Sequence, residues 1–354
     1  MKAISVEELQ PGMTLARTIV NDDMVVVLSA DTLLTKAHIT RLSYLDLPTV
    51  YIKDEYELSS NYQNVVSLFS PSNAFISEYK EIVHAAKEIF DVAAKDSETA
   101  IQKAEEVVSE SVAPMVMQSG VIDYLFELNH LASDIYNHSL RVSILSGVIG
   151  KWMLFSQNKI NDLILAGFLH DIGKTKFPDR LIGKNVEYLK GDDLDAYMQH
   201  TLDGHQILRS NKNLSEGVKL AALQHHEAMD GTGFPFNSSG KDINEYAKIV
   251  AVVDLYDNIT TERQGFKKET PFVAIKQIIQ QMYSKLDPGV CVPFVSHIKG
   301  AFLGSRVLLN NGLQGTIVRY EQDFEAEPLI RIDQDTVIDL NTQKNIKIVE
   351  YNPK

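Results

Sequence analysis

Between residues 120 and 298 the chain alternates amphipathic helical stretches with loops marked by glycine and proline, and no run of strand-like segments interrupts them. This pattern limits the fold more than any other feature of the sequence. It predicts an all-α domain, because exposed strands would require apolar and polar residues to alternate along the chain. The flanking regions carry different patterns and are expected to form separate modules.

Short β-type segments at residues 24–28 and 49–52 surround a helical stretch at residues 36–45, which predicts a small N-terminal module. Apolar residues recur at helical spacing from Phe75 to Ala93, and a second helix is expected over residues 98–117. After Gly300, β-type segments at residues 306–309, 315–320, 329–332 and 347–349 predict a β-rich tail. We therefore expect a mainly α protein with a small α/β N-terminal module (1–60), a helical linker region (61–118), an all-helical central domain (119–298) and a β-rich C-terminal extension (299–354).

Charge and composition argue against several classes of protein. The formal net charge of −13 disfavours binding to duplex nucleic acid, which depends on lysine and arginine. No apolar run approaches the roughly 18–20 residues of a membrane span, and the N-terminus lacks the features of a secretory signal. The single cysteine, Cys291, cannot form an internal disulfide, which fits a reducing compartment. We expect a cytoplasmic protein whose anionic ligands need a local positive centre.

Side chains of the kind that bind transition metals are concentrated in the central domain. Six of the ten histidines lie between residues 138 and 226. Neutral imidazole together with carboxylate suits iron, manganese, zinc or nickel. The informative residues are Asp134, His138, His170, Asp171, Lys174, His200, His225, His226 and Asp254.

The spacing of these residues supports a shared site. Asp134 and His138 are four apart and are expected on one face of a helix, about one turn from each other. The same spacing is expected to place His170 and Lys174 on one side, where Asp171 is suited to bridging two ions.

Asp254 lies in an apolar stretch where an unpaired carboxylate would be costly to bury, so we expect it to have a cationic partner. Each of these residues, taken alone, is better explained as an ordinary core or surface residue. Their joint occurrence at regular spacing favours a metal site.

Over residues 120–298 the sequence closely resembles the HD-GYP family of bacterial phosphodiesterases, a branch of the HD superfamily. The N-terminal segment Leu9-Gln10-Pro11-Gly12-Met13 and the β tail also resemble extensions found in that family. The resemblance rests on His138-Ser139-Leu140-Arg141-Val142, His170-Asp171-Ile172-Gly173-Lys174, His200 with Gly204 and Leu208, His225-His226-Glu227, Asp230-Gly231-Thr232-Gly233-Phe234-Pro235, and Asp254 with Arg263.

The resemblance implies a metal-dependent hydrolase that acts on cyclic di-GMP, which the family opens to pGpG and often cleaves further to GMP. It assigns catalytic roles to Asp171 and to Lys174, which would stabilise charge in the transition state. The expected cofactor is two or three transition-metal ions, iron or alternatively manganese. One ion would be held by His138, His170, Asp171 and Asp254, a second by Asp171, His200, His225 and His226, and Asp134 would help to bind a third, where a subset of the family has Glu.

The sequence also departs from the family pattern. The namesake Gly-Tyr-Pro is Gly233-Phe234-Pro235 here, and this segment forms either a tight turn or a loop beside the active site that contacts substrate or a partner protein. The family's Arg-Pro-Tyr segment is replaced by Arg263-Gln264-Gly265, with Arg263 in its usual place as a phosphate ligand or as a surface residue. The expected substrate contacts are Arg263, Lys267, Gly231, Gly233, Phe234 and Pro235.

Two other functions stay open at this stage. The chain could be a receptor that binds cyclic di-GMP without turnover, although the complete ligand set with Lys174 argues against this. It could also hydrolyse another nucleotide, such as a mixed cyclic dinucleotide. The expected partners are a homodimer formed through the helices before Gly120, which could equally pack on the catalytic domain, and a diguanylate cyclase or other signalling protein contacted by the Gly-Phe-Pro loop.

Overall fold

The computed structural model divides the chain into two compact units, residues 1–70 and residues 71–354. Each unit is described by itself. The described residues are 2–16, 19–20, 26–28, 32–43, 49–52, 73–118, 120–122, 125, 134–181, 184, 186–262, 267–321, 323–333 and 336–352.

The N-terminal unit combines short antiparallel strand pairs with a helix, as the sequence predicts. The strand β1 (Lys2–Ile4) pairs with β4 (Val50–Ile52), and β2 (Ile19–Val20) pairs with β3 (Val26–Leu28). A 3-10 turn, η1 (Val6–Glu8), follows β1, and the helix α1 (Lys36–Leu42) precedes β4. The first residues of the predicted 24–28 segment lie outside the described residues. Leu15, Leu34 and Leu42 are fully buried in a small core of this unit.

The second unit opens with an antiparallel pair of helical segments. The helix α3 (Asn73–Ala93) is followed by α4 (Ser97–Val107), the π-helical turn η2 (Val108–Val112) and α5 (Ala113–Met117). Asp96 caps α4, because its carboxylate accepts a hydrogen bond from the amide of Thr99 at 3.1 Å. The predicted periodicity is confirmed, since the apolar stripe of α3 is buried at Phe75, Tyr79, Ile82, Ala86, Ile89, Phe90 and Ala93.

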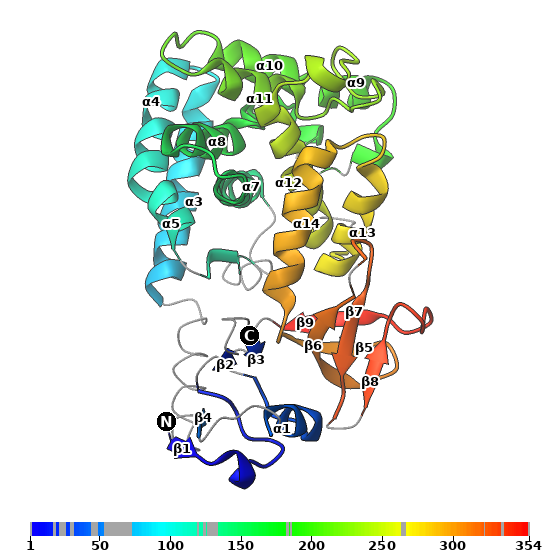
Figure 1. Ribbon diagram of the computed structural model, residues 1–354. Helices are drawn as coiled ribbons and strands as arrows, with labels where there is room; N and C mark the ends of the chain where they lie inside the picture. The colour runs from blue at the N-terminus through cyan, green and yellow to red at the C-terminus, as the bar shows by residue number, and fades with distance from the viewer. Residues whose placement is uncertain are drawn as a thin grey trace. The chain divides into compact units, whose positions relative to one another are not determined.

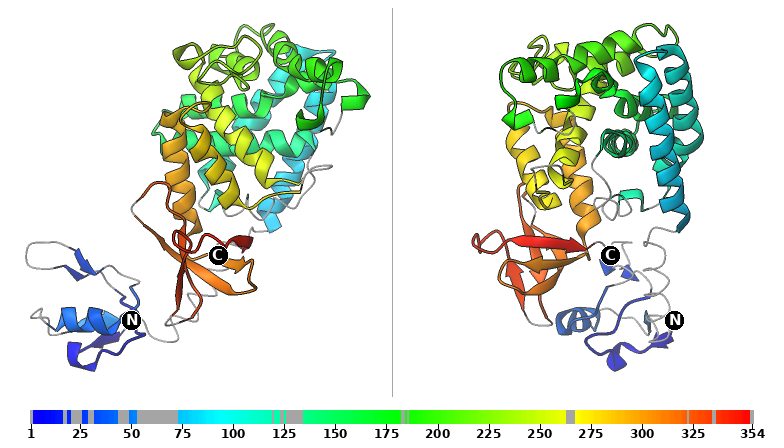
Figure 2. Two further views of the ribbon diagram at one scale, coloured as in Figure 1. Left: turned by 90° about the vertical axis from the view of Figure 1, so that its right-hand side faces the viewer. Right: turned by 180° about the vertical axis from the view of Figure 1, so that it is seen from behind.

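Helices build the rest of this unit up to Phe302. In Figure 1, α7 is seen nearly end-on, with α3, α4 and α5 on one side and α12, α13 and α14 on the other, and the view from behind in Figure 2 agrees. The helices are α7 (Ile135–Trp152), α8 (Gln157–Leu169), α9 (Asp192–Met198), α10 (His200–Leu208), α11 (Glu216–Gln224), α12 (Glu245–Thr260), α13 (Pro271–Gln281) and α14 (Pro288–Phe302), with 3-10 turns η3 (Ile172–Lys176), η4 (Asp179–Leu181), η5 (Val186–Tyr188) and η6 (Gly240–Asp242).

The burial of α7 explains why its sequence lacks a polar face. Leu140, Val142, Ile144 and Ile149 are fully buried, and the small polar residues between them are buried as well. A helix surrounded by other helices is apolar on all sides. The metal-ligand candidate on this helix, His138, is therefore carried by the most enclosed element of the unit.

The C-terminal residues form a five-stranded antiparallel sheet in the order β8-β7-β6-β5-β9. Its buried residues Val307, Ile317 and Ile330 belong to the same hydrophobic cluster as the helices. The four predicted segments are confirmed as strands, whereas β8 was missed because it is only three residues long. The strands are β5 (Arg306–Leu309), β6 (Gln314–Tyr320), β7 (Pro328–Arg331), β8 (Val337–Asp339) and β9 (Ile348–Asn352).

The predicted fold class is confirmed: the chain is mainly helical, with small β regions at both ends. The division into four regions stays a prediction, because the helices and strands after residue 71 share one core. Among the described residues, none of the helices combines the length and apolar character needed to cross a membrane.

Candidate metal centre

The predicted ligands come from separate helices and meet in the interior of the helical region. His138 lies in the first turn of α7, and His170 is the residue that ends α8. His200 opens α10, while His225 and His226 follow the last turn of α11. The site is thus built from residues that sequence separation alone could not place together.

The first cluster joins His138, His170, Asp171 and Asp254. The Nε2 atom of His138 lies 3.1 Å from Oδ1 of Asp254, 3.5 Å from Oδ2 of Asp171 and 3.3 Å from Nε2 of His170. The Nε2 atom of His170 lies 3.4 Å from Oδ2 of Asp171 and 3.9 Å from Oδ1 of Asp254. Ligand atoms about 2.1 Å from one ion are separated by about 3–3.5 Å, so this spacing fits a shared ion.

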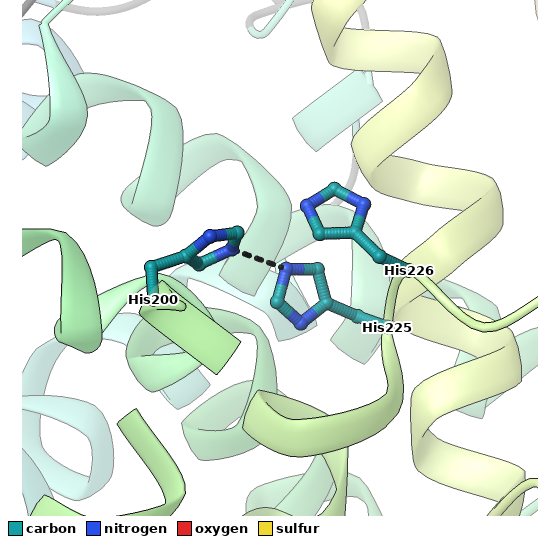
Figure 3. A group of neighbouring side chains, drawn as sticks. All are labelled: His200, His225 and His226. Carbon is teal, nitrogen blue, oxygen red and sulfur yellow. Dashed lines mark hydrogen bonds between the residues drawn. The ribbon is translucent and has the colours of Figure 1, made fainter. Parts of the chain in front are cut away.

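The second cluster joins His200, His225 and His226, and one ring nitrogen of each lies within 4.8 Å of one ring nitrogen of both others. Figure 3 shows the three rings pointing towards one another from two different segments of the chain. The Nε2 atoms of His200 and His225 are 3.4 Å apart, which is the contact drawn as a dashed line.

Asp171 links the two clusters through its two oxygens. Its Oδ2 faces His138 and His170, whereas its Oδ1 lies 3.4 Å from Nε2 of His200 and 3.6 Å from Nε2 of His225. The carboxylate therefore has the position that the sequence predicted for a bridging ligand.

The backbone around Gly173 makes this bridge possible. A Cβ at this position would lie 1.9 Å from the carbonyl oxygen of His200 and 2.5 Å from the amide of Gly204. Only glycine lets the turn after Asp171 approach the start of α10 so closely.

The hydrogen bonds of the imidazoles explain why the clusters need cations. The Nδ1 atoms of His170, His200 and His225 bond to the backbone carbonyls of Gly167, Tyr197 and Ala221. A carbonyl can only accept, so these Nδ1 atoms carry the protons and each Nε2 presents a lone pair.

Lone pairs therefore face each other in the second cluster, and in the first cluster the lone pair of His170 faces the carboxylates of Asp171 and Asp254. The Nε2 atom of His226 and the Oδ1 atom of Asp171 are also buried and have no hydrogen-bond partner among the described residues. Such buried groups are unfavourable unless a cation is present, and the donor set of imidazole and carboxylate suits a transition metal.

The pKa values of the buried groups favour the metal-binding protonation state in the second cluster. Burial lowers the pKa of His200 to about 4 and holds the pKa of His226 well below its usual value. Burial opposes the charge on Asp171, but attraction by Lys174 and His170 outweighs it and holds the pKa of this carboxyl well below its usual value. In the first cluster, burial is outweighed by hydrogen bonds to Asp171 and Asp254, which raise the pKa of His138 to about 10 in the metal-free protein.

Lys174 contacts Asp171 from a 3-10 turn, and not from a side that it shares with His170. The prediction that His170 and Lys174 share one side of a helix is wrong, because α8 ends at Leu169 and residues 172–176 form a 3-10 turn. Side chains three apart are aligned in a 3-10 turn, which brings the Nζ atom of Lys174 to 2.5 Å from Oδ2 of Asp171. Burial opposes charge on this lysine, but Asp171 outweighs burial and raises its pKa.

Asp257 and Arg141 support the first cluster; the sequence pattern included Arg141 only as part of a motif and did not indicate Asp257. The Nδ1 atom of His138 donates to Oδ2 of Asp257 at 2.8 Å. Arg141 donates to the same carboxylate through Nε at 2.6 Å and Nη2 at 3.0 Å. A carboxylate that holds the second nitrogen of a metal-binding histidine fixes its tautomer and raises its basicity. One feature of the sequence could have indicated this role of Asp257: it lies three residues after Asp254, and residues three apart share one face of a helix.

Asp134 lies just before α7 and not within it, so the expectation that it shares a helix face with His138 is wrong. Its carboxylate accepts from the backbone amide of Asn137 at 2.8 Å and from the side-chain amide of Asn137 at 3.0 and 3.1 Å. Asp134 is the N-cap of α7, a common role for this residue type. Its predicted contribution to a third ion stays a prediction.

The Gly-Phe-Pro segment forms the expected tight turn and lies beside a metal-ligand candidate, whereas its contact with substrate or a partner protein stays a prediction. Gly231 has a φ of +77° in a tight turn, and a Cβ on Gly233 would lie 2.4 Å from the amide of Ala228. The ring of Phe234 stacks on His226 with centroids 4.7 Å apart, so the loop lies against a metal-ligand candidate. Pro235 follows a cis peptide bond.

The two basic residues expected to contact substrate are not placed at the site by the structure. Arg263 lies outside the described residues. Lys267 is exposed and makes no described contact with either cluster. Both substrate contacts stay predictions, as does contact of Gly231, Gly233, Phe234 and Pro235 with substrate.

Comparisons with known proteins agree with this architecture. Residues 126–290 match the family described as HD domain. The cyclic di-GMP phosphodiesterase PA4108 of Pseudomonas aeruginosa is 28% identical over 229 residues, covering 65% of this chain and 55% of that protein. A cyclic di-GMP phosphodiesterase of Thermotoga maritima is 34% identical over 173 residues, covering 46% of each protein. The chain thus spans about half the length of these curated relatives.

Among solved structures, Bd1817, described as an HDG"Y"P protein from Bdellovibrio bacteriovorus, superposes with a TM-score of 0.55 at 20% identity. The superposition covers 84% of this chain and 99% of that chain, and at this identity it shows a shared fold. The family resemblance seen in the sequence is therefore confirmed, since residues 126–290 match the HD domain model.

Proposed function

We propose that this protein is a metal-dependent phosphodiesterase that hydrolyses cyclic di-GMP to pGpG, GMP or both. The observation that carries the proposal is the position of Asp171, whose two oxygens face two separate histidine clusters. This arrangement fits two neighbouring ions with a shared carboxylate, as in two-metal phosphodiester hydrolysis. The names of the two curated relatives support cyclic di-GMP as the substrate.

The residues of the chain would prepare a positive site inside an acidic protein. Metal ions bound there supply a nucleophilic water at neutral pH and neutralise the phosphate oxygens. Lys174 stays protonated, because Asp171 raises its pKa, and its ammonium adds a fixed positive charge beside the bridge. The ligand set of imidazole and carboxylate, without thiolate, is compatible with iron or manganese, which are the proposed ions. Asp134 is the proposed ligand of a third.

The test compares cyclic di-GMP hydrolysis by the wild-type protein, the Asp171→Asn variant and the Asp192→Asn variant. Asp192 is exposed at the start of α9, so its substitution is a matched control that removes one carboxylate away from the clusters. We expect turnover by the wild type and the control, and loss of turnover in Asp171→Asn.

The substrate arm of the test separates the other candidate functions. Metal-loaded protein that binds cyclic di-GMP but releases no pGpG or GMP would be a receptor. Faster turnover of a mixed cyclic dinucleotide than of cyclic di-GMP would identify a different substrate. Equal activity of Asp171→Asn and wild type would rule out the proposed mechanism.

The homodimer, the signalling partner and the cytoplasmic location are proposals as well. The apolar stripe of α3 is buried within the chain, so a homodimer would require another surface. Contact of the Gly-Phe-Pro loop with a diguanylate cyclase or another signalling protein stays a proposal, supported by the anchoring of this loop against His226. A cytoplasmic location stays a proposal, which the single cysteine, Cys291, supports because it fits a reducing compartment.

A further inference from the structure

A tyrosine on α3 reaches the helix that carries the first metal-ligand candidate. Tyr79 lies outside residues 126–290, which match the HD domain, yet its side chain is 0% exposed. Its hydroxyl donates to the backbone carbonyl of Asn137 at 3.4 Å. Asn137 is the residue immediately before His138, so α3 contacts the turn of α7 that carries this ligand candidate.

The same turn of α7 carries the network that orients His138. Arg141 lies one turn after Asn137, is 1% exposed, and holds the Asp257 carboxylate that accepts from Nδ1 of His138. Tyr79 adjoins this network through its hydrogen bond to Asn137, and the charges of Arg141 and Asp257 both shift its pKa. Burial raises the pKa of Tyr79 to about 12, so the hydroxyl keeps its proton and remains a donor at neutral pH.

Packing of α3 on α7 keeps Tyr79 in register with this turn. The ring of Phe90 meets Tyr136 edge-on with centroids 5.8 Å apart, and it meets Phe168 on α8 at 6.3 Å. These contacts join α3 to α7 and α8, two of the three helices that supply ligand candidates of the first cluster. The helix that the sequence assigned to a linker region is therefore packed as part of the site.

We propose that Tyr79 is a positioning residue for the first metal ion. It fixes the turn from Asn137 to Arg141, and through that turn it sets the direction of the His138 imidazole. The inference rests on the proposed function, because it requires the first cluster to bind a metal. Partners that hold a metal ligand from outside its first coordination sphere typically change affinity by about 10- to 100-fold when they are lost.

The test measures Mn²⁺ binding and not catalysis. The full-length protein is freed of metal with a chelator and titrated with Mn²⁺, and free Mn²⁺ is followed by electron paramagnetic resonance. The Tyr79→Phe variant removes one oxygen and keeps the ring. The matched control is Tyr136→Phe, which removes a hydroxyl from the same α3–α7 interface, where it bonds to Asp91 and not to Arg141. The Tm of each variant checks that the fold is retained.

We expect Tyr79→Phe to bind one Mn²⁺ about tenfold more weakly while the other ion binds as in the wild type. Tyr136→Phe should keep both wild-type affinities at a similar Tm. Unchanged Mn²⁺ binding by Tyr79→Phe, or an equal loss in Tyr136→Phe, would overturn the positioning role and leave the proposed function intact. Failure of the wild type itself to bind Mn²⁺ would instead overturn the proposed function.

Discussion

The Asp257→Asn variant should reveal two effects of the buried Asp257–Arg141 ion pair, one on the stability of the protein and one on metal binding. Asp257 and Arg141 are 2% and 1% exposed, and two short hydrogen bonds of 2.6 and 3.0 Å join them. The variant leaves the guanidinium buried without its counter-charge. Removing one partner of a buried pair costs about 3–5 kcal/mol, so we expect the free energy of unfolding, measured with urea, to fall by that amount.

Metal binding should weaken in the same variant for a different reason. Asp257 accepts the proton of Nδ1 of His138 at 2.8 Å, and a neutral amide in its place makes the imidazole less basic. We expect Mn²⁺ affinity at one ion to fall about 10- to 100-fold. The double variant Arg141→Met/Asp257→Leu removes both charges, which is often close to neutral for stability. It should regain most of the lost stability without regaining metal affinity.

Two results would contradict this reasoning. A loss of less than about 1 kcal/mol in Asp257→Asn would mean that the pair is not buried and coupled as described. Recovery of both stability and Mn²⁺ affinity in the double variant would mean that Asp257 affects the metal site only through the fold.

The remaining predictions concern the bridge, the cation and the pH dependence. Gly173→Ala should displace Asp171 from His200, because the added Cβ would lie 1.9 Å from the backbone oxygen of His200. Isothermal titration should then show the loss of one bound ion. Binding of both ions by the variant would contradict the close approach at Gly173. Lys174→Met should lower kcat about 10²- to 10³-fold while elemental analysis finds the metal retained, and unchanged kcat would remove Lys174 from the mechanism. The pKa of His200 is about 4 when metal-free, against about 6.5 unfolded. The unfolded chain therefore takes up the proton first, and urea unfolding of metal-free protein should show stability decreasing as the pH falls from about 6.5 to 4. This slope should be shallower in His200→Gln, because His226 still contributes, and a slope equal to that of the wild type would exclude a contribution from His200.

The sequence predicted the helical architecture because long periodic segments carry a strong signal. The stripe from Phe75 to Ala93 is buried as expected, and α7 and α8 lie where apolar residues dominate. Short elements were harder to predict. The strand β8 has three residues, too few for alternation to be distinguished from a loop.

The metal-ligand candidates could be predicted because residue type and order carry the family resemblance. How they meet could not be derived from spacing. The spacing of four between His170 and Lys174 suggested a shared helix face, but the chain changes from an α-helix to a 3-10 turn at this point. Asp134 likewise has the spacing of a helical neighbour of His138 and serves instead as a cap.

The partners behind the ligands were missed because their roles depend on tertiary contacts. Arg141 was noted only as part of a motif, and its pairing with Asp257 spans 116 positions of the chain. Tyr79 has the spacing of an ordinary core residue, and only the three-dimensional contact with Asn137 gives its hydroxyl a partner. Sequence pattern therefore predicted what could bind metal, whereas the structure was needed to find what holds the ligands in place.

Electron paramagnetic resonance of the fully Mn²⁺-loaded protein tests whether Asp171 bridges two ions that the two histidine clusters hold. Two Mn²⁺ ions that share a carboxylate, about 3.5–4 Å apart, are magnetically coupled. The wild-type protein should give the spectrum of two coupled Mn²⁺ ions. The Asp171→Asn variant should give the spectrum of isolated Mn²⁺. A spectrum of isolated, uncoupled ions in the fully loaded wild-type protein would contradict the bridging role of Asp171.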